Sequence, residues 1–199
     1  MTADKGLSAH RQRPGMSQGS RSRMTDSVVV GVLATITMDA GLVLASLAGG
    51  ERLGSDKIDL GLIGRWSLGL AHGRLRHPDL AAGPAVRGEI AAGLATHYLT
   101  GIVLTRLYFE LARRARLGAG SSGTPARGPA ATLGAATAFG AATALLPCLI
   151  LYPSWGYGPF ARRSADAGPL VRTMLLGHTV FGAGIGMWAL LLDRRRSRR

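Results

Sequence analysis

Residues 28 to 49 read VVVGVLATITMDAGLVLASLAG, an apolar stretch that holds a single ionisable residue, Asp39. About 20 helical residues cross a hydrocarbon core of about 30 Å, so this stretch is long enough to span a bilayer. It is too long, and with its carboxylate too polar, to be the apolar segment of a cleaved signal peptide. The sequence therefore predicts an uncleaved transmembrane helix that carries an acid.

Three further stretches have a similar length and character, at residues 90–111, 130–152 and 170–192. Pro147 lies inside the second of these and should kink it, because proline cannot donate its backbone hydrogen bond. Pro169 stands at the first turn of the last one, where proline is tolerated. The predicted fold class is all-α, a bundle of four transmembrane helices.

The remaining segments differ from one another in composition. Residues 1–26 are polar and rich in Ser, Gly and Arg, which predicts a disordered basic arm before a membrane domain at 27–192. Residues 193–199 form a basic cytoplasmic tail. The first connection contains LGLIGRWSLGL at 60–70, which is apolar along one helical face but too short to span. This pattern predicts a short interfacial or re-entrant helix in the first outer loop.

The net charge of +13 comes almost entirely from arginine. These charges flank the apolar stretches and do not alternate with aromatic residues on one face, so no nucleic-acid partner is expected and the lipid bilayer is the predicted partner. The arm (1–26), the second connection (112–129) and the tail (193–199) together hold 14 Lys and Arg. The first connection (50–89) and the third (154–168) together hold 8. The positive-inside rule therefore predicts a multi-pass protein with both termini in the cytoplasm.

Three ionisable side chains in different helices fall at nearly the same predicted depth. At about 1.5 Å per residue, Asp39 lies roughly 15 Å, His97 roughly 12 Å and His178 roughly 13 Å from the outer ends of their helices. Each stands on a stripe of small residues spaced four apart, the pattern where membrane helices meet. The stripe residues include Gly31, Thr35, Gly93, Gly101, Gly182 and Gly186, the last two forming a GxxxG pair. The three side chains should therefore point into the bundle, with Thr35 and Thr100 as nearby hydroxyl donors.

An acid at the bilayer centre costs about 2.5–3.5 kcal/mol on insertion scales and needs a partner or a water-filled cavity. A polar lock between helices and a proton-linked or small-solute pathway both satisfy that need. A metal or haem site using Asp39, His97 and His178 is a further alternative. The last alternative is a non-catalytic assembly subunit, such as a homo-oligomer that associates through the GxxxG face.

The sequence favours a non-enzymatic protein. A Gly-rich phosphate loop, a nucleophile elbow and an HExxH motif are all missing, and no cofactor is expected. At the outer face, Arg65 beside Trp66 is expected to hold a lipid phosphate or to pair with Glu89 or Asp59.

The order of several short motifs resembles a bacterial membrane family known as domain of unknown function 2938. The motifs are TMDAG (37–41), LIGRWSLGLAHGR (62–74), GEIAAG (88–93), THYLTG (96–101), LPCLILYPSWGYG (146–158) and LLGHTVFGAGIG (175–186). The positions that carry the resemblance are Asp39, Gly64, Arg65, Trp66, Glu89, His97, Tyr98, His178, Phe181 and Gly182. The resemblance covers residues 28–192 and implies a four-span bacterial inner-membrane protein of unassigned activity, without catalytic residues to carry over.

Overall fold

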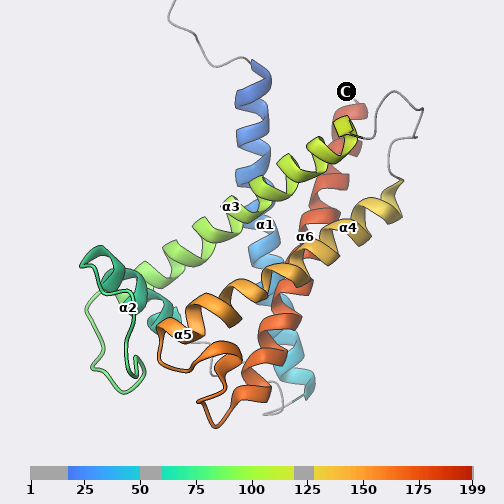
Figure 1. Ribbon diagram of the computed structural model, residues 1–199. Coiled ribbons are helices and arrows are strands. Elements are labelled where there is room, and N and C mark those ends of the chain that lie inside the picture. Colours follow the sequence, from blue (N-terminus) through green and yellow to red (C-terminus); the bar gives the residue numbers. More distant parts are fainter. Residues whose placement is uncertain (1–17, 50–59, 119–127, 199) are drawn as a thin grey trace, which may run out of the picture.

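The computed structural model describes residues 18–49, 60–118 and 128–198, and these residues form helices and connecting turns with no strand (Figure 1). The helices are α1 (Gln18–Gly49), α2 (Leu60–Ala71), α3 (Glu89–Gly118), α4 (Pro129–Thr143), the π-helix η3 (Pro147–Leu151), α5 (Tyr152–Ser154), the 3₁₀ turn η4 (Pro159–Ala161) and α6 (Ala167–Ser197). Four helical segments are long and apolar enough to cross a membrane: Met24–Ala48, Glu89–Ala115, Pro129–Ser154 and Ala167–Ser197. The predicted all-α chain with four such helices is confirmed.

The helices run further than the apolar stretches that revealed them. Helix α1 begins at Gln18, inside the segment predicted as a disordered arm, and residues 1–17 lie outside the described residues. Helix α6 continues to Ser197, inside the predicted tail. Hydrophobicity marks where a chain meets lipid, whereas the backbone hydrogen bonds can continue into water. An ion pair between Arg196 and Asp26, with Nη1 at 2.9 Å from Oδ2, joins these two extended ends.

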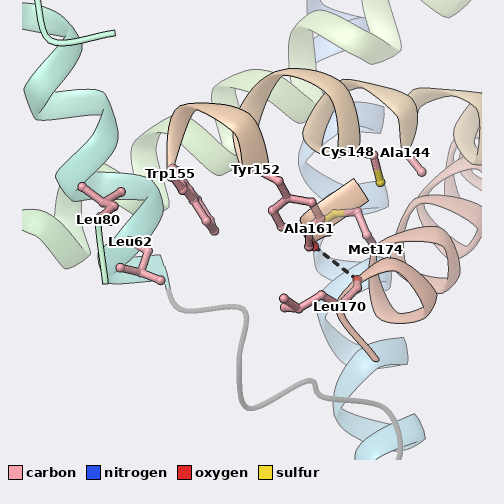
Figure 2. Close-up of a cluster of buried hydrophobic side chains, with 9 residues drawn as sticks. All are labelled: Leu62, Leu80, Ala144, Cys148, Tyr152, Trp155, Ala161, Leu170 and Met174. Carbon is pink, nitrogen blue, oxygen red and sulfur yellow. Dashed lines mark hydrogen bonds between the residues drawn. The ribbon is translucent and has the colours of Figure 1, made fainter. Parts of the chain in front are cut away.

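The third membrane-crossing segment is interrupted where the sequence predicted a kink. Helix α4 ends at Thr143, and a π-helical turn begins at Pro147. The Tyr152 amide bonds to the Pro147 carbonyl, five residues back, which is the π-helical pattern. This turn points Cys148 and Tyr152 into the protein, where the Tyr152 hydroxyl donates to the Leu170 carbonyl of α6 at 3.2 Å (Figure 2).

Small residues allow the helices to approach closely, as the stripes predicted. Gly140 of α4 and Gly182 of α6 face each other so closely that a methyl group on either would overlap the backbone of the other helix. Gly186 packs against Leu133 of α4. The Gly182–Gly186 face is thus packed against α4 within the chain. Gly93 likewise packs against the backbone of α2, at Leu60.

Two apolar clusters hold the bundle together, one toward each end. The inner cluster comprises Val30, Ala34, Leu104, Tyr108, Ala136, Phe181 and Ile185 from α1, α3, α4 and α6. The outer cluster comprises Leu62, Leu80, Ala144, Cys148, Tyr152, Trp155, Ala161, Leu170 and Met174 (Figure 2). The outer cluster ties α2 and the loop after it to the turn region around α5, so the short helix predicted in the first outer loop caps one end of the bundle (Figure 1).

Candidate polar site in the membrane domain

The structure brings Asp39 of α1 into direct contact with two neighbouring residues of α3. The Nε2–H of His97 donates to Asp39 Oδ1 at 2.9 Å, and the Tyr98 hydroxyl donates to Oδ2 at 3.2 Å. The His97 and Tyr98 rings meet edge to face, with 5.6 Å between their centroids. Each carboxylate oxygen therefore has its own donor from the adjacent helix.

This pair lies deep in the apolar part of the helices. The membrane-crossing part of α1 ends at Ala48, so Asp39 lies about 14 Å from that end at about 1.5 Å per residue. His97 lies about 12 Å from the start of α3 at Glu89 by the same measure. The Asp39 side chain is 41% exposed in the single chain and that of His97 is 18% exposed. The carboxylate is therefore bonded to α3 but not enclosed by the described helices.

His178 of α6 does not bond to the pair. Its Nδ1–H donates to the Met174 carbonyl, one turn back, at 2.9 Å, so its own helix orients the ring. In the neutral ring, Nε2 of His178 is left as a proton acceptor. The structure thus bonds two of the three predicted ionisable groups to each other, while the third bonds to its own helix.

The two threonines predicted as donors are used differently. Thr35 is buried, and its hydroxyl donates to the Gly31 carbonyl at 2.8 Å. Its side chain packs against Gly101 of α3, where an added methyl would overlap the hydroxyl. Thr100 lies on an exposed face of α3. A threonine in a helix often bonds to the carbonyl four residues back, so it need not serve a neighbouring acid. The role predicted for Thr35 is taken by Tyr98.

Among residues 18–49, 60–118 and 128–198, no three His, Cys, Asp or Glu side chains are grouped so that they could hold a metal ion. Of the predicted metal ligands, His97 donates a hydrogen bond through Nε2 to Asp39, and His178 donates one through Nδ1 to the Met174 carbonyl of its own helix. Each histidine keeps its second ring nitrogen, Nδ1 of His97 and Nε2 of His178, without a hydrogen bond to the described residues.

A second polar network ties the middle of α2 to the start of α3. Arg65 donates to both Glu89 carboxylate oxygens, through Nε at 2.8 Å and Nη2 at 3.2 Å, and each side chain is only 12% exposed. Arg65 Nη1 also donates to the carbonyls of Leu80 at 3.0 Å and Gly83 at 2.6 Å. The Val86 amide donates to the same Glu89 carboxylate at 2.8 Å. This network fixes the loop that precedes α3.

Of the partners predicted for Arg65, Glu89 is the one observed, and Asp59 lies outside the described residues. Trp66, the neighbour of Arg65, packs against the outer cluster. Its indole Nε1 is buried, and the described residues supply it with no hydrogen-bond partner. Arg65 and Trp66 thus contribute to the packing between α2, the loop that follows it and the start of α3.

Tyr98 is the contact that the sequence reasoning did not assign to the polar site. Adjacent residues on an α-helix point about 100° apart, so Tyr98 falls outside the stripe of residues spaced four apart that singled out His97. The feature of the sequence that could have revealed this contact is that residue 98 is a tyrosine. A tyrosine hydroxyl within an apolar helix seeks a hydrogen-bond partner, and Asp39 was the nearest acid predicted at that depth.

No curated protein and no solved structure matches this chain. A family model described as protein of unknown function (DUF2938) matches residues 28–192. The match spans Asp39, His97, Tyr98 and His178 together with the Arg65–Glu89 network. The chain is therefore a membrane protein of unassigned activity that belongs to the DUF2938 family.

Proposed function

We propose that this protein carries out a proton-linked function in the membrane, with Asp39 as the group that takes up and releases the proton. The carboxylate itself is the observation that carries the proposal. It lies deep within apolar helices, is 41% exposed, and accepts bonds from His97 and Tyr98. Those bonds offset the cost of an acid in lipid, about 2.5–3.5 kcal/mol, without sealing the acid from exchange.

The neighbouring groups are able to pass protons. Neutral His97 donates through Nε2 and can accept at Nδ1, and the Tyr98 hydroxyl can both donate and accept. His178 offers Nε2 on α6, a helix that packs against α1. Acids and histidines in sequence are the usual components of intramembrane proton relays. A small solute that moves together with the proton is compatible with the same site.

We further propose a bacterial inner membrane as the location, with both termini in the cytoplasm. The excess of Lys and Arg in the arm, the second connection and the tail supports this orientation. The Asp26–Arg196 ion pair supports it too, because it joins the beginning of α1 to the end of α6 on one side of the bundle.

The test is proton flux into liposomes that contain the purified protein and a pH-sensitive dye, under an imposed pH gradient or membrane potential. The wild type should raise the rate of proton entry, and Asp39→Asn should abolish the increase. Asp193→Asn is the matched control, because it removes an exposed carboxylate at the end of α6 and should leave the flux unchanged. Rates are normalised to folded protein measured by size-exclusion chromatography.

A polar lock between α1 and α3 predicts a different pattern. In that case Asp39→Asn lowers the free energy of unfolding, while the flux per folded molecule equals that of the wild type. Asp39→Glu sharpens the distinction, because it keeps an ionisable acid but alters the packing. Proton flux that survives in Asp39→Glu and disappears in Asp39→Asn supports exchange at this carboxyl. Wild-type liposomes that leak no faster than empty ones overturn the proposal.

A further inference from the structure

A hollow of about 410 Å³ lies at the outer end of the molecule, between the end of α2 and the loop that leads to α3. Four basic or titratable side chains line it: Arg65, His72, Arg74 and His77. One acid, Asp79, also lines it. The hollow lies outside the Asp39 site and uses none of its residues.

The positive charge of this hollow is only partly neutralised. Arg65 is paired with Glu89, and Asp79 Oδ1 accepts bonds from the Ala81 and Ala82 amides, both at 3.1 Å, in its own turn. Arg74 is exposed and forms no ion pair within the part of the chain that the structure describes. The hollow therefore has a free cation at its rim.

The two histidines add hydrogen-bonding nitrogens that the protein does not use. His72 Nδ1–H donates to the Leu68 carbonyl at 2.8 Å, which leaves its Nε2 available. His77 Nε2 is buried and has no hydrogen-bond partner among the described residues. It lies against Gly69, which also lines the hollow. Buried polar atoms are nearly always bonded, so an unused nitrogen beside a cavity marks a place for a ligand oxygen.

The walls of the hollow are held in place and stand at the level of a membrane surface. The His77 amide donates to the Ser154 carbonyl at 2.8 Å, and the Leu80 amide to the Trp155 carbonyl at 3.0 Å. The loop directly precedes the membrane-crossing part of α3. Two apolar side chains are exposed beside it, Leu75 at 66% and Val86 at 46%. Basic and apolar groups side by side are typical of the headgroup region.

We propose that this hollow binds the phosphate group of a phosphate ester, with Arg74 as the charge partner and His77 as a hydrogen-bond donor through Nε2–H. Guanidinium groups and ring N–H groups are strong donors to phosphate oxygens, and the charge makes these bonds shorter and stronger. The phosphate can come from a phospholipid headgroup in the facing leaflet or from a soluble phosphate ester. The site is independent of the proton-linked function proposed above.

The experiment measures ligand binding to delipidated full-length protein in detergent by native mass spectrometry. The probes are phosphatidylglycerol, diacylglycerol with the same acyl chains but no phosphate, and glycerol 3-phosphate, which has no acyl chains. Arg74→Gln should weaken phosphatidylglycerol binding about tenfold, the effect of losing one charge-assisted contact. Arg76→Gln is the matched control, because Arg76 is equally exposed two residues away and does not line the hollow. His77→Gln is a second variant inside the hollow and should also weaken binding.

Binding of phosphatidylglycerol alone, lost in Arg74→Gln and kept in Arg76→Gln, supports a lipid headgroup site. Binding of glycerol 3-phosphate with the same dependence on Arg74 supports a soluble phosphate ester. Diacylglycerol that binds as tightly as phosphatidylglycerol overturns the proposal, because the phosphate then contributes nothing. Equal binding by Arg74→Gln and Arg76→Gln also overturns it, as does an absence of binding by all three probes.

Discussion

Replacing Gly140 by alanine should force α4 away from α6 and lower the free energy of unfolding by about 2 kcal/mol. The added methyl would lie 2.5 Å from the Cα of Gly182 and would overlap the His178 carbonyl oxygen. Carbon atoms in contact prefer a separation of about 3.5–4.0 Å. The two helices would therefore have to separate by about 1 Å at their crossing.

The size of this effect follows from what surrounds the crossing. The atoms in the way belong to the backbone and cannot rotate aside as a side chain can. Separation of the helices would loosen the contacts of Ala136 and Phe181, which are buried in the inner cluster. Overpacking a tight site costs about 1–3 kcal/mol, and a backbone clash belongs at the upper end. Alanine's greater helix propensity offsets about 0.5–1 kcal/mol of this destabilisation.

The assay is unfolding by SDS in mixed micelles, followed by circular dichroism. Gly134→Ala is the matched control, because Gly134 lies on the same helix and an added methyl there has no atom within 4 Å. It should be neutral or stabilising by about 0.5–1 kcal/mol. The reasoning is refuted if Gly140→Ala and Gly134→Ala unfold at the same fraction of SDS.

Three further outcomes follow from the described contacts. Glu89→Gln leaves the largely buried Arg65 guanidinium without its counter-charge, so hydrogen exchange of residues 79–88 should speed up, with a loss of about 2 kcal/mol in the stability of this loop. Unchanged exchange would contradict the Arg65–Glu89 network. Tyr98→Phe removes one donor to Asp39 and should lower the SDS unfolding free energy by about 0.5–1.5 kcal/mol, and no change would mean that this contact is not formed. Burial, and to a lesser extent the charge of a nearby aspartate, raises the pKa of Tyr157 above its ordinary value of 10.0. The unfolded chain then loses this proton first, so stability should fall as pH rises above 10, a fall that Tyr157→Phe should reduce in pH-dependent melting curves.

Much of the fold could be predicted from the sequence because a bilayer allows only a few kinds of structure to cross it. Each crossing needs about 20 apolar residues, and close helix contacts need small side chains, so stripes such as Gly93–His97–Gly101 indicated the packed faces. The contact between Asp39 and His97 agrees with their similar predicted depth, while the Asp39 side chain stays 41% exposed rather than enclosed. Depth and direction are the two quantities that helical periodicity specifies.

The rest depended on information that periodicity does not contain. A stripe of small residues shows that a face is packed but not what packs on it, so the GxxxG pair did not reveal α4 as its partner. The way α2 is held could not be predicted, because Arg65 donates to backbone carbonyls of an irregular loop, those of Leu80 and Gly83. Tyr98 lay off the stripe because side chains next to each other in sequence point in different directions. Side-chain rotamers decided which of these groups reached the carboxylate.

Proton exchange by Asp39, while it is bonded to His97 and Tyr98, is tested most directly by infrared difference spectroscopy of the protein in liposomes as the pH is lowered. We expect a protonated-carboxyl band that Asp39→Asn abolishes and that His97→Gln shifts in frequency, because the bond to Oδ1 is lost. A spectrum in which Asp39→Asn removes no carboxyl band, at any pH where the protein stays folded, would contradict a proton-exchanging Asp39.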